Sequence, residues 1–223
     1  MDTIKFDKKN VKMVAHRGLS GIERENTNAA FVAAGNRSYF GIETDTHITA
    51  DGKFIITHDA STVRLSGIDA NVEELPFEAV RGIRLWDRGT KQIRSDLTLP
   101  TLEEYIRICK RYEKVSVLEL KGAGNIESYT EMVELIKAIG HFENTIFISF
   151  GRENCLMIKE IAPEAKVQYL VSNWSDELLP FMKEKGIDLD IYYGAVTQEL
   201  VDLIHENGLE INCWTVDKPE DGE

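Results

Sequence analysis

The chain of 223 residues carries 26 Lys and Arg against 38 Asp and Glu, which gives a formal net charge of −12 at pH 7. This excess of negative charge argues against nucleic acid or an anionic membrane surface as a partner, because both are polyanions. The length suits one α/β domain, since barrels of this class often exceed roughly 200 residues as a single unit.

The first 100 residues predict a strand, a helix and a hairpin, followed by an irregular segment. A short apolar run indicates a strand at residues 12–16, and an apolar stripe indicates a helix at 26–34. Alternating residues on both sides of an Asp-Gly dipeptide predict a strand and hairpin at 41–59. Residues 60–100 carry scattered glycine, proline and charge without periodicity, so we expect an inserted hairpin and cap at about 46–100.

The pattern becomes regular from residue 101, where short apolar strands alternate with amphipathic helices. The expected helices are 101–112, 128–140, 152–161, 176–186 and 197–208, and the expected strands are 115–121, 145–150, 167–171, 189–194 and 211–216. This alternation predicts a parallel sheet with right-handed crossovers. It gives seven βα-type units, whereas a closed TIM barrel has eight. We expect an α/β protein, residues 1–223 forming a single TIM (β/α)8 barrel domain whose eighth unit is missing from this sequence.

The cysteines and the hydropathy pattern bound the cellular setting. Cys109, Cys155 and Cys213 are odd in number and lack the spacing of a zinc site, so we expect buried free thiols. No apolar run approaches the roughly 18 residues of a membrane span, and the N-terminus lacks the apolar core of a signal peptide. We therefore expect a cytoplasmic protein without stable membrane insertion, provided that no leader was removed.

Two acidic residues lie within the apolar strand of the hairpin. Glu43 and Asp45 are two residues apart, so their side chains project from the same face of the strand. If Asp51 and Gly52 form a two-residue turn, the register places Asp45 opposite His58, with Cβ atoms about 5 Å apart. Two carboxylates on one face, with an imidazole beside them, predict a cation site.

Further polar groups end the other predicted strands, where the active residues of such barrels lie. This edge carries His16, Arg17, Glu43, Asp45, Glu119, Lys121 and Trp214, and the hairpin adds His58. Three carboxylates without cysteine form a hard oxygen site suited to one divalent cation, Mg²⁺ or Ca²⁺. Arg17 and Lys121 supply positive charge for an anionic substrate, and two histidines can exchange protons near neutral pH. This combination predicts cleavage at phosphorus.

These residues also carry a family resemblance. The motifs are HRG at 16–18, ENT at 25–27, IETDTHITADG at 42–52, HD at 58–59, LELK at 118–121 and WTV at 214–216. Together they resemble the glycerophosphodiester phosphodiesterase family. The resemblance implies a TIM barrel with an insertion after the second strand, a divalent metal, and hydrolysis of small-molecule glycerophosphodiesters to glycerol 3-phosphate and an alcohol.

Position by position, the resemblance implies roles for individual residues. It implies metal ligands at Glu43, Asp45 and Glu119, catalytic histidines at His16 and His58, phosphate contacts from Arg17 and Lys121, and a pocket aromatic at Trp214. It further implies attack by the glycerol 2-hydroxyl to give a cyclic phosphate, with the histidines as acid and base. The chain departs from the family pattern at Arg24, where proline is usual, and in the absence of the closing helix and strand.

Two alternatives stay open at this point. An inactive or ligand-binding relative would follow if the missing unit abolished catalysis, although every charged residue that the chemistry requires is present. A barrel lipase of the phosphatidylinositol-phospholipase C type is disfavoured, because it resembles the chain only in the paired histidines. Among the remaining histidines, we expect His47 to lie outside the first contacts of the site, and His141 and His205 to be solvated near helix ends.

Overall fold

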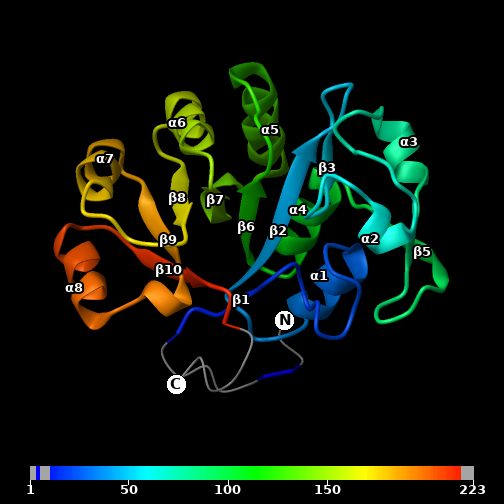
Figure 1. Ribbon diagram of the computed structural model, residues 1–223, viewed down its shortest axis with the longest axis horizontal. Helices are drawn as coiled ribbons and strands as arrows, with labels where there is room; N and C mark the ends of the chain where they lie inside the picture. Colours follow the sequence, from blue (N-terminus) through cyan, green and yellow to red (C-terminus); the bar gives the residue numbers. More distant parts are fainter. Residues whose placement is uncertain (1–3, 6–10, 217–223) are drawn as a thin grey trace.

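The computed structural model describes residues 4–5 and 11–216. Seven parallel strands form one sheet in the order β1-β2-β6-β7-β8-β9-β10. They are β1 (Val14–Ala15), β2 (Gly41–Ile48), β6 (Val115–Leu120), β7 (Thr145–Ser149), β8 (Lys166–Val171), β9 (Asp188–Tyr192) and β10 (Ile211–Trp214). The larger helices are α1 (Asn28–Gly35), α4 (Leu102–Arg111), α5 (Ile126–Ile139), α6 (Arg152–Ile161), α7 (Leu178–Lys185) and α8 (Gln198–Glu206). The predicted alternation of parallel strands and helices is confirmed (Figure 1).

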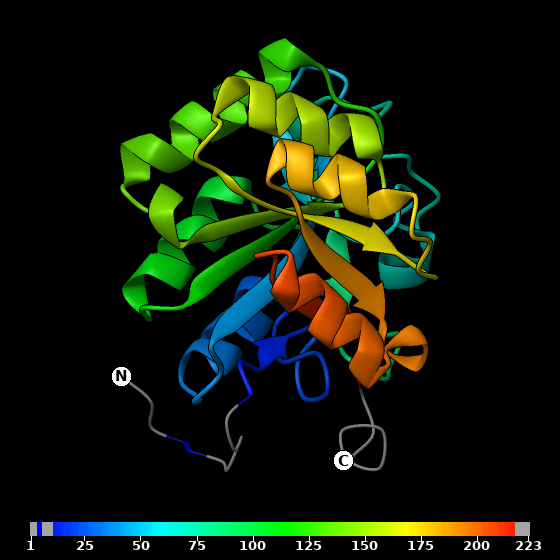
Figure 2. The same ribbon diagram turned by 90° about the vertical axis from the view of Figure 1, so that its left-hand side faces the viewer.

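The two faces of the sheet have different partners. Ile42, Leu118 and Phe147 are fully buried in the main core, where helices pack on the outer face of the sheet (Figure 2). Val117 and Ile148 belong to a separate apolar cluster. This second cluster lies on the inner face of the sheet, opposite the helices. Since strand side chains alternate between faces, residues two positions from Val117 point to the same inner face. The polar groups at the strand ends can therefore converge on the inner side.

Helix α4 is fixed to the sheet by its first turns. Thr101 and Glu104 form a reciprocal capping box, which satisfies backbone donors at the start of the helix. One turn later the buried Tyr105 hydroxyl donates to the carbonyl oxygen of Ile42 at 2.7 Å, and its ring meets Phe31 edge-on at 5.0 Å between centroids. These contacts fix α1 and α4 against the strand that carries the first two carboxylates.

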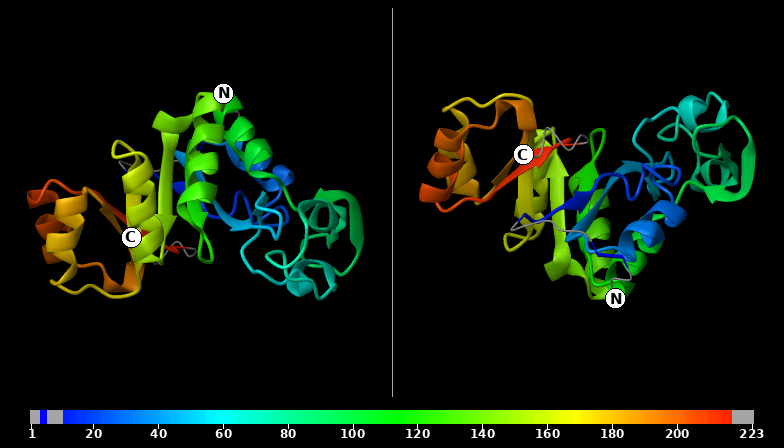
Figure 3. Two further views of the ribbon diagram at one scale, coloured as in Figure 1. Left: turned by 90° about the horizontal axis from the view of Figure 1, so that it is seen from above. Right: turned by 90° about the horizontal axis from the view of Figure 1, so that it is seen from below.

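The sheet is an open arc in the part of the chain that the structure describes. β1 and β10 are its two edge strands, and neither has a second parallel neighbour within residues 4–5 and 11–216. Figure 3 shows the arc from above and from below.

The hairpin register differs from the expected one. β2 pairs with β3 (Phe54–Ile56) so that Thr46 faces Ile56, which places Thr57, not His58, opposite Asp45. The amide of Thr49 donates to the carbonyl of Lys53 at 2.8 Å, so the loop contains three residues rather than two. Gly52, with φ +75°, takes the left-handed position that a three-residue hairpin loop requires. The prediction was wrong because an Asp-Gly pair fits both loop lengths.

The segment after the hairpin forms a lobe with apolar contacts of its own. Its elements are α2 (Val63–Ser66), α3 (Phe77–Gly82) and the antiparallel pair β4 (Arg84–Trp86) and β5 (Ile93–Thr98). Leu65, Val80 and Leu97 are buried together with other apolar residues of the lobe. Figures 1 and 3 place this lobe at the opposite end of the molecule from α7 and α8.

Two expectations about burial were wrong. His141, expected to be solvated, is only 4 % exposed, because it lies in the turn that packs the end of α5 against β7. Cys213, expected to be buried, is exposed since it lies on an edge strand, whereas Cys109 and Cys155 are buried free thiols as expected. His205 is exposed as expected. Among the described residues, no helix combines the length and apolar character that spanning a bilayer requires.

Candidate active site

Three carboxylates meet at the C-terminal ends of two neighbouring strands. Asp45 of β2 pairs in register with Glu119 of β6, and Glu43 lies two residues before Asp45 on the same face. One carboxylate oxygen from each residue lies within 4.8 Å of the others. All three side chains are buried, so the structure gathers the predicted acidic set in a place with little solvent.

Lys121 lies directly against this acidic cluster, defined here as Glu43, Asp45 and Glu119. Its Nζ is 2.8 Å from Glu119 Oε1 and 3.2 Å from Asp45 Oδ1. Burial would lower the pKa of Lys121, but these two carboxylates raise it, so the ammonium stays charged.

One ammonium does not offset three carboxylates. Burial and the charges of Asp45 and Glu119 raise the pKa of Glu43 well above its usual range. Burial and the charge of Asp45 likewise raise the pKa of Glu119 to about 7. Burial opposes ionisation of Asp45 as well, but Lys121 and Asn26 more than offset it and lower its pKa. The cluster therefore lacks positive charge.

Asn26 orients one of the carboxylates. Its side chain is fully buried, and its Nδ2 donates to Asp45 Oδ2 at 2.7 Å while its Oδ1 accepts from the Thr44 hydroxyl at 2.7 Å. The backbone of Asn26 has φ +52°, a left-handed conformation that asparagine tolerates better than most residues. The residue-by-residue reasoning missed Asn26, although it belongs to the ENT motif.

Arg17 enters the same site from the loop after β1. Its backbone amide donates to Glu43 Oε2 at 2.7 Å, and its Nη1 donates to Glu25 Oε1 at 2.9 Å. Its Nε lies 3.7 Å from Asp45 Oδ2 and is a buried donor without a hydrogen-bond acceptor among the described residues. An unsatisfied guanidinium nitrogen beside the acidic cluster is suited to donate a hydrogen bond to an anionic oxygen.

The two predicted histidines lie on different segments beside the cluster. His16 Nε2 is 3.9 Å from Glu43 Oε2. His58 Nδ1 is 2.6 Å from Asp59 Oδ1, which directs the other ring nitrogen away from that carboxylate. The charge of His58 also contributes to lowering the pKa of Asp45. About one third of each histidine side chain is exposed, so both rings can reach a ligand at the mouth.

His47 is a supporting residue rather than a member of the cluster. The ring is buried, with Nδ1 2.7 Å from Glu73 Oε1 and Nε2 3.2 Å from the carbonyl oxygen of His58. It therefore ties the hairpin to the inserted lobe next to His58, in agreement with the expectation that it lies outside the first contacts.

Aromatic rings line the far side of the inner face. Trp214 packs against the Val117 and Ile148 cluster, directly next to the strand positions of the carboxylates. Its ring meets Phe150 at 5.4 Å and Tyr192 at 5.7 Å between centroids. Phe150 and Tyr192 are substantially exposed, so the group offers an apolar surface at the strand ends.

The acidic cluster fits a divalent metal ion. Its ligands are three carboxylates, and oxygen is the ligand atom that Mg²⁺ and Ca²⁺ prefer. Burial and the charges of the neighbouring carboxylates raise the pKa of Glu43 and of Glu119, and a cation beside them would favour their ionised forms. The chemistry of the ligands and the charge balance thus both favour a hard cation here.

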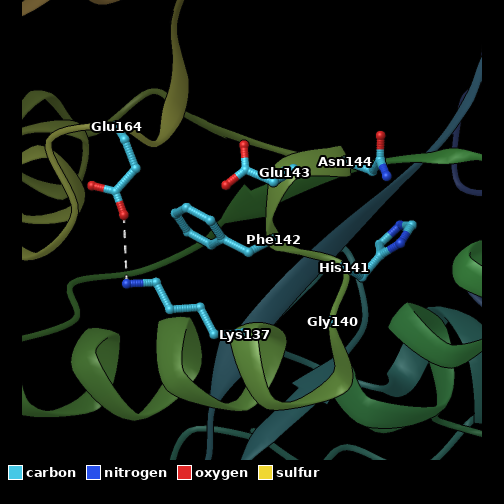
Figure 4. A pocket seen from close by; sticks show the side chains of 7 residues that line it. All are labelled: Lys137, Gly140, His141, Phe142, Glu143, Asn144 and Glu164. Carbon is cyan, nitrogen blue, oxygen red and sulfur yellow. Dashed lines mark ion pairs between the residues drawn. The ribbon is translucent and has the colours of Figure 1, made fainter.

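A separate cavity of about 360 Å³ lies where α5 ends and β7 begins. Figure 4 shows its lining, with a dashed line for the ion pair between Lys137 and Glu164. The Nζ of Lys137 lies 3.6 Å from Glu164 Oε1. These residues lie at the N-terminal end of β7, whereas the acidic cluster lies at the C-terminal ends of β2 and β6. The cavity is therefore not part of the acidic site.

Known proteins and one protein family are similar to this chain. The model of the glycerophosphoryl diester phosphodiesterase family matches residues 16–222. A glycerophosphodiester phosphodiesterase of Caldanaerobacter subterraneus subsp. tengcongensis is 30% identical over 222 residues, covering 95% of this chain and 88% of that protein. A similar enzyme of Bacillus altitudinis is 27% identical over 218 residues, covering 92% and 86%.

Solved structures share the fold. An Oleispira antarctica phosphodiesterase in complex with the product sn-glycerol-3-phosphate has a TM-score of 0.82 at 24% identity, covering 95% of this chain and 87% of that chain. A glycerophosphodiester phosphodiesterase from Parabacteroides distasonis has a TM-score of 0.76 at 26% identity, covering 96% and 87%. With the family model matching nearly the whole chain, the protein belongs to the glycerophosphoryl diester phosphodiesterase family.

Proposed function

We propose that the protein hydrolyses glycerophosphodiesters to glycerol 3-phosphate and an alcohol. The observation that carries the proposal is the acidic cluster, whose three carboxylates lie within 4.8 Å of one another beside two histidines and two basic side chains. Family membership supports the reaction class. The product in the Oleispira antarctica structure supports a small-molecule substrate.

The substrate phosphate would lie at the mouth of the acidic cluster. Its oxygens would be held by Arg17, whose Nε lacks an acceptor in the part of the chain that the structure describes, and by Lys121, whose ammonium lies at the edge of the cluster. Trp214 would contact the apolar part of the substrate. Glu43, Asp45 and Glu119 would hold one Mg²⁺ or Ca²⁺, which when bound supplies a Lewis acid for phosphoryl oxygen.

His16 and His58 would move the protons. One imidazole accepts the proton of the glycerol 2-hydroxyl as its oxygen attacks phosphorus, and the other protonates the departing alcohol oxygen. The product of this step is a cyclic glycerol phosphate, which water opens to glycerol 3-phosphate with the histidine roles reversed. Asp59 holds Nδ1 of His58, which leaves Nε2 for the reaction.

The fold proposal extends beyond the arc that the structure shows. We infer that the seven-stranded arc has the strand order of a TIM barrel with one strand fewer, and that it forms one domain with its inserted lobe. The single path of parallel strands from β1 to β10 supports the barrel. The hydrogen bond of His47 to the carbonyl of His58, next to its contact with Glu73 of the lobe, supports one domain.

Release of glycerol 3-phosphate from glycerophosphocholine and glycerophosphoethanolamine tests the activity. His16→Ala and His58→Ala should each lower kcat by about 100-fold or more, since general acid-base catalysis contributes about 10²–10⁴-fold. His205→Ala, a substitution of an exposed histidine on α8, serves as the matched control and should leave kcat unchanged. Full activity of both site variants, or none in the wild type with either metal, would contradict the proposal.

Phosphorus NMR tests the cyclic route. A glycerol cyclic phosphate signal should rise and fall during the reaction, and a substrate without the 2-hydroxyl should be inert. Turnover of that deoxy substrate at the normal rate would exclude internal attack.

A further inference from the structure

Arg64 occupies an unusual position between two loops of the site. It belongs to the short helix α2 in the inserted lobe. Its Nη1 and Nη2 each donate to one oxygen of Glu25 at 2.8 Å, and its Nε donates to Asp59 Oδ2 at 2.6 Å. A single guanidinium thus joins the loop before α1 to the loop after β3, and it uses the forked geometry that only arginine offers.

Each of these carboxylates holds a second group that faces the site. Glu25 Oε1 accepts from Arg17 Nη1 at 2.9 Å, and Asp59 Oδ1 lies 2.6 Å from His58 Nδ1. Arg64 is therefore linked to Arg17 through Glu25 and to His58 through Asp59. The sequence separation between Arg64 and Glu25 is 39 residues, so the link depends on how the lobe packs.

The link also affects the ionisation of Glu25. Burial alone would raise the pKa of Glu25, but the hydrogen bond from Arg64 and the charge of Arg17 lower it to about 2. Arg64 itself is 43% exposed, whereas Glu25 is 18% exposed. Exposed ion pairs contribute only about 0–1 kcal/mol to stability. We therefore expect the link to matter for the orientation of the groups that it joins rather than for the stability of the fold.

We propose that Arg64 is a positioning residue that fixes Arg17 and His58 in their working orientations through Glu25 and Asp59. The inference rests on the proposed function, because it assigns the two positioned groups to phosphate binding and proton transfer. It gives the inserted lobe a defined task, namely to hold a basic residue and a histidine that come from two separate loops. Within the described residues, Arg64 contacts Glu25 and Asp59 and no residue of the acidic cluster.

The test compares Arg64→Gln with Arg94→Gln. Arg94 is the matched control because it is also a partly exposed arginine of the lobe with several carboxylate partners, at 3.1 Å from Glu23 and 2.7 Å from Asp96. Among the described residues, these partners and Asp87 form no ion pair with a residue of the proposed site. Arg64→Lys is the third variant, since a lysine keeps the charge but cannot bridge both carboxylates.

The first readout is steady-state hydrolysis of glycerophosphocholine. Arg64→Gln should lower kcat by about 10-fold to 100-fold, because a misplacement of about 1 Å can cost this much. Arg64→Lys should recover only a small part of the loss, and Arg94→Gln should stay within about twofold of wild type. A rise in KM with kcat unchanged would show that Arg64 supports only substrate binding through Arg17, and would overturn the proposal that it also positions His58.

The second readout does not need catalysis. Proton–nitrogen NMR of histidine-labelled, metal-free protein should show a slowly exchanging Nδ1 proton on His58, assigned through the signal lost in His58→Asn. This proton should exchange faster in Arg64→Gln and be unchanged in Arg94→Gln. An unchanged His58 signal in Arg64→Gln, or equal kcat in the two glutamine variants, overturns the proposal. If wild type releases no glycerol 3-phosphate, the proposed function fails, and the NMR comparison still tests Arg64.

Discussion

Replacing Lys121 by methionine should destabilise the metal-free protein strongly. The ammonium lies 2.8 Å from Glu119 Oε1 and 3.2 Å from Asp45 Oδ1, and only 17% of its side chain is exposed. With an effective dielectric constant near 20, each contact at about 3 Å corresponds to about 5 kcal/mol of attraction, offset by the cost of burying the lysine. Removing one partner of a buried ion pair costs about 3–5 kcal/mol.

A divalent cation should compensate for this loss. The acidic cluster of Lys121→Met retains all three carboxylates but lacks the ammonium. A bound cation therefore neutralises more negative charge in this variant than in wild type. A ligand at 1,000 times its Kd stabilises the folded state by about 4 kcal/mol. The metal-induced rise in Tm should therefore be larger in Lys121→Met than in wild type.

Thermal melts with EDTA, and with saturating Mg²⁺ or Ca²⁺, measure both effects. At about 2–4 °C per kcal/mol for a chain of this size, Lys121→Met should melt about 10 °C below wild type in EDTA. Lys137→Met is the control, because Lys137 is 37% exposed and lies 3.6 Å from Glu164, far from the cluster. It should shift Tm by about 2 °C or less. Equal metal-induced shifts in wild type and Lys121→Met would refute the reasoning.

Three further predictions concern single residues. Asp190 is a buried carboxyl, and burial raises its pKa to about 7. Between about pH 4 and 7 it is therefore protonated in the folded state and ionised in the unfolded state. The free energy of unfolding should fall as pH rises through this range. In denaturant melts, the free energy of unfolding of Asp190→Asn should fall by up to about 4 kcal/mol less than that of wild type over the same pH range. Asn26→Ala should cost about 1–3 kcal/mol and weaken divalent-metal binding in calorimetry, since Asp45 loses a buried donor. Cys213, the exposed cysteine, should react with a thiol reagent much faster than the two buried ones.

Each of these has a contradicting result. A wild-type stability that stays flat or rises from pH 4 to 7, with no change in slope for Asp190→Asn, would show that Asp190 does not hold a proton in the folded state. Unaltered metal affinity in Asn26→Ala would mean that the amide does not orient Asp45. Three thiols that react at one common rate would contradict the burial pattern.

Local periodicity predicted most of the fold. Strand alternation placed Glu43 and Asp45 on one face, and the regular strand and helix pattern after residue 101 predicted the parallel order that sets Asp45 beside Glu119. The hairpin register was wrong because a dipeptide turn signal does not distinguish loop lengths that differ by one residue. That difference decides whether His58 or Thr57 lies opposite Asp45.

The supporting contacts were beyond sequence reasoning. Arg64 meets Glu25 across 39 positions, and Arg24 donates to the carbonyl oxygen of Trp86 across 62. Such contacts depend on how an irregular lobe packs, which no local periodicity encodes. Burial of His141 has the same cause, since polarity and a place near a helix end suggest exposure, while tertiary packing decides it.

Phosphorus NMR of wild-type protein with glycerophosphocholine tests the central claim most directly, in a single sample that receives Mg²⁺ or Ca²⁺, then excess EDTA, then the metal again. Glycerol 3-phosphate should form with metal, stop forming with EDTA, and form again when the metal is restored. Hydrolysis that continues at the same rate in EDTA, or no hydrolysis with either cation, would contradict the claim that the acidic cluster holds a divalent ion for phosphodiester cleavage.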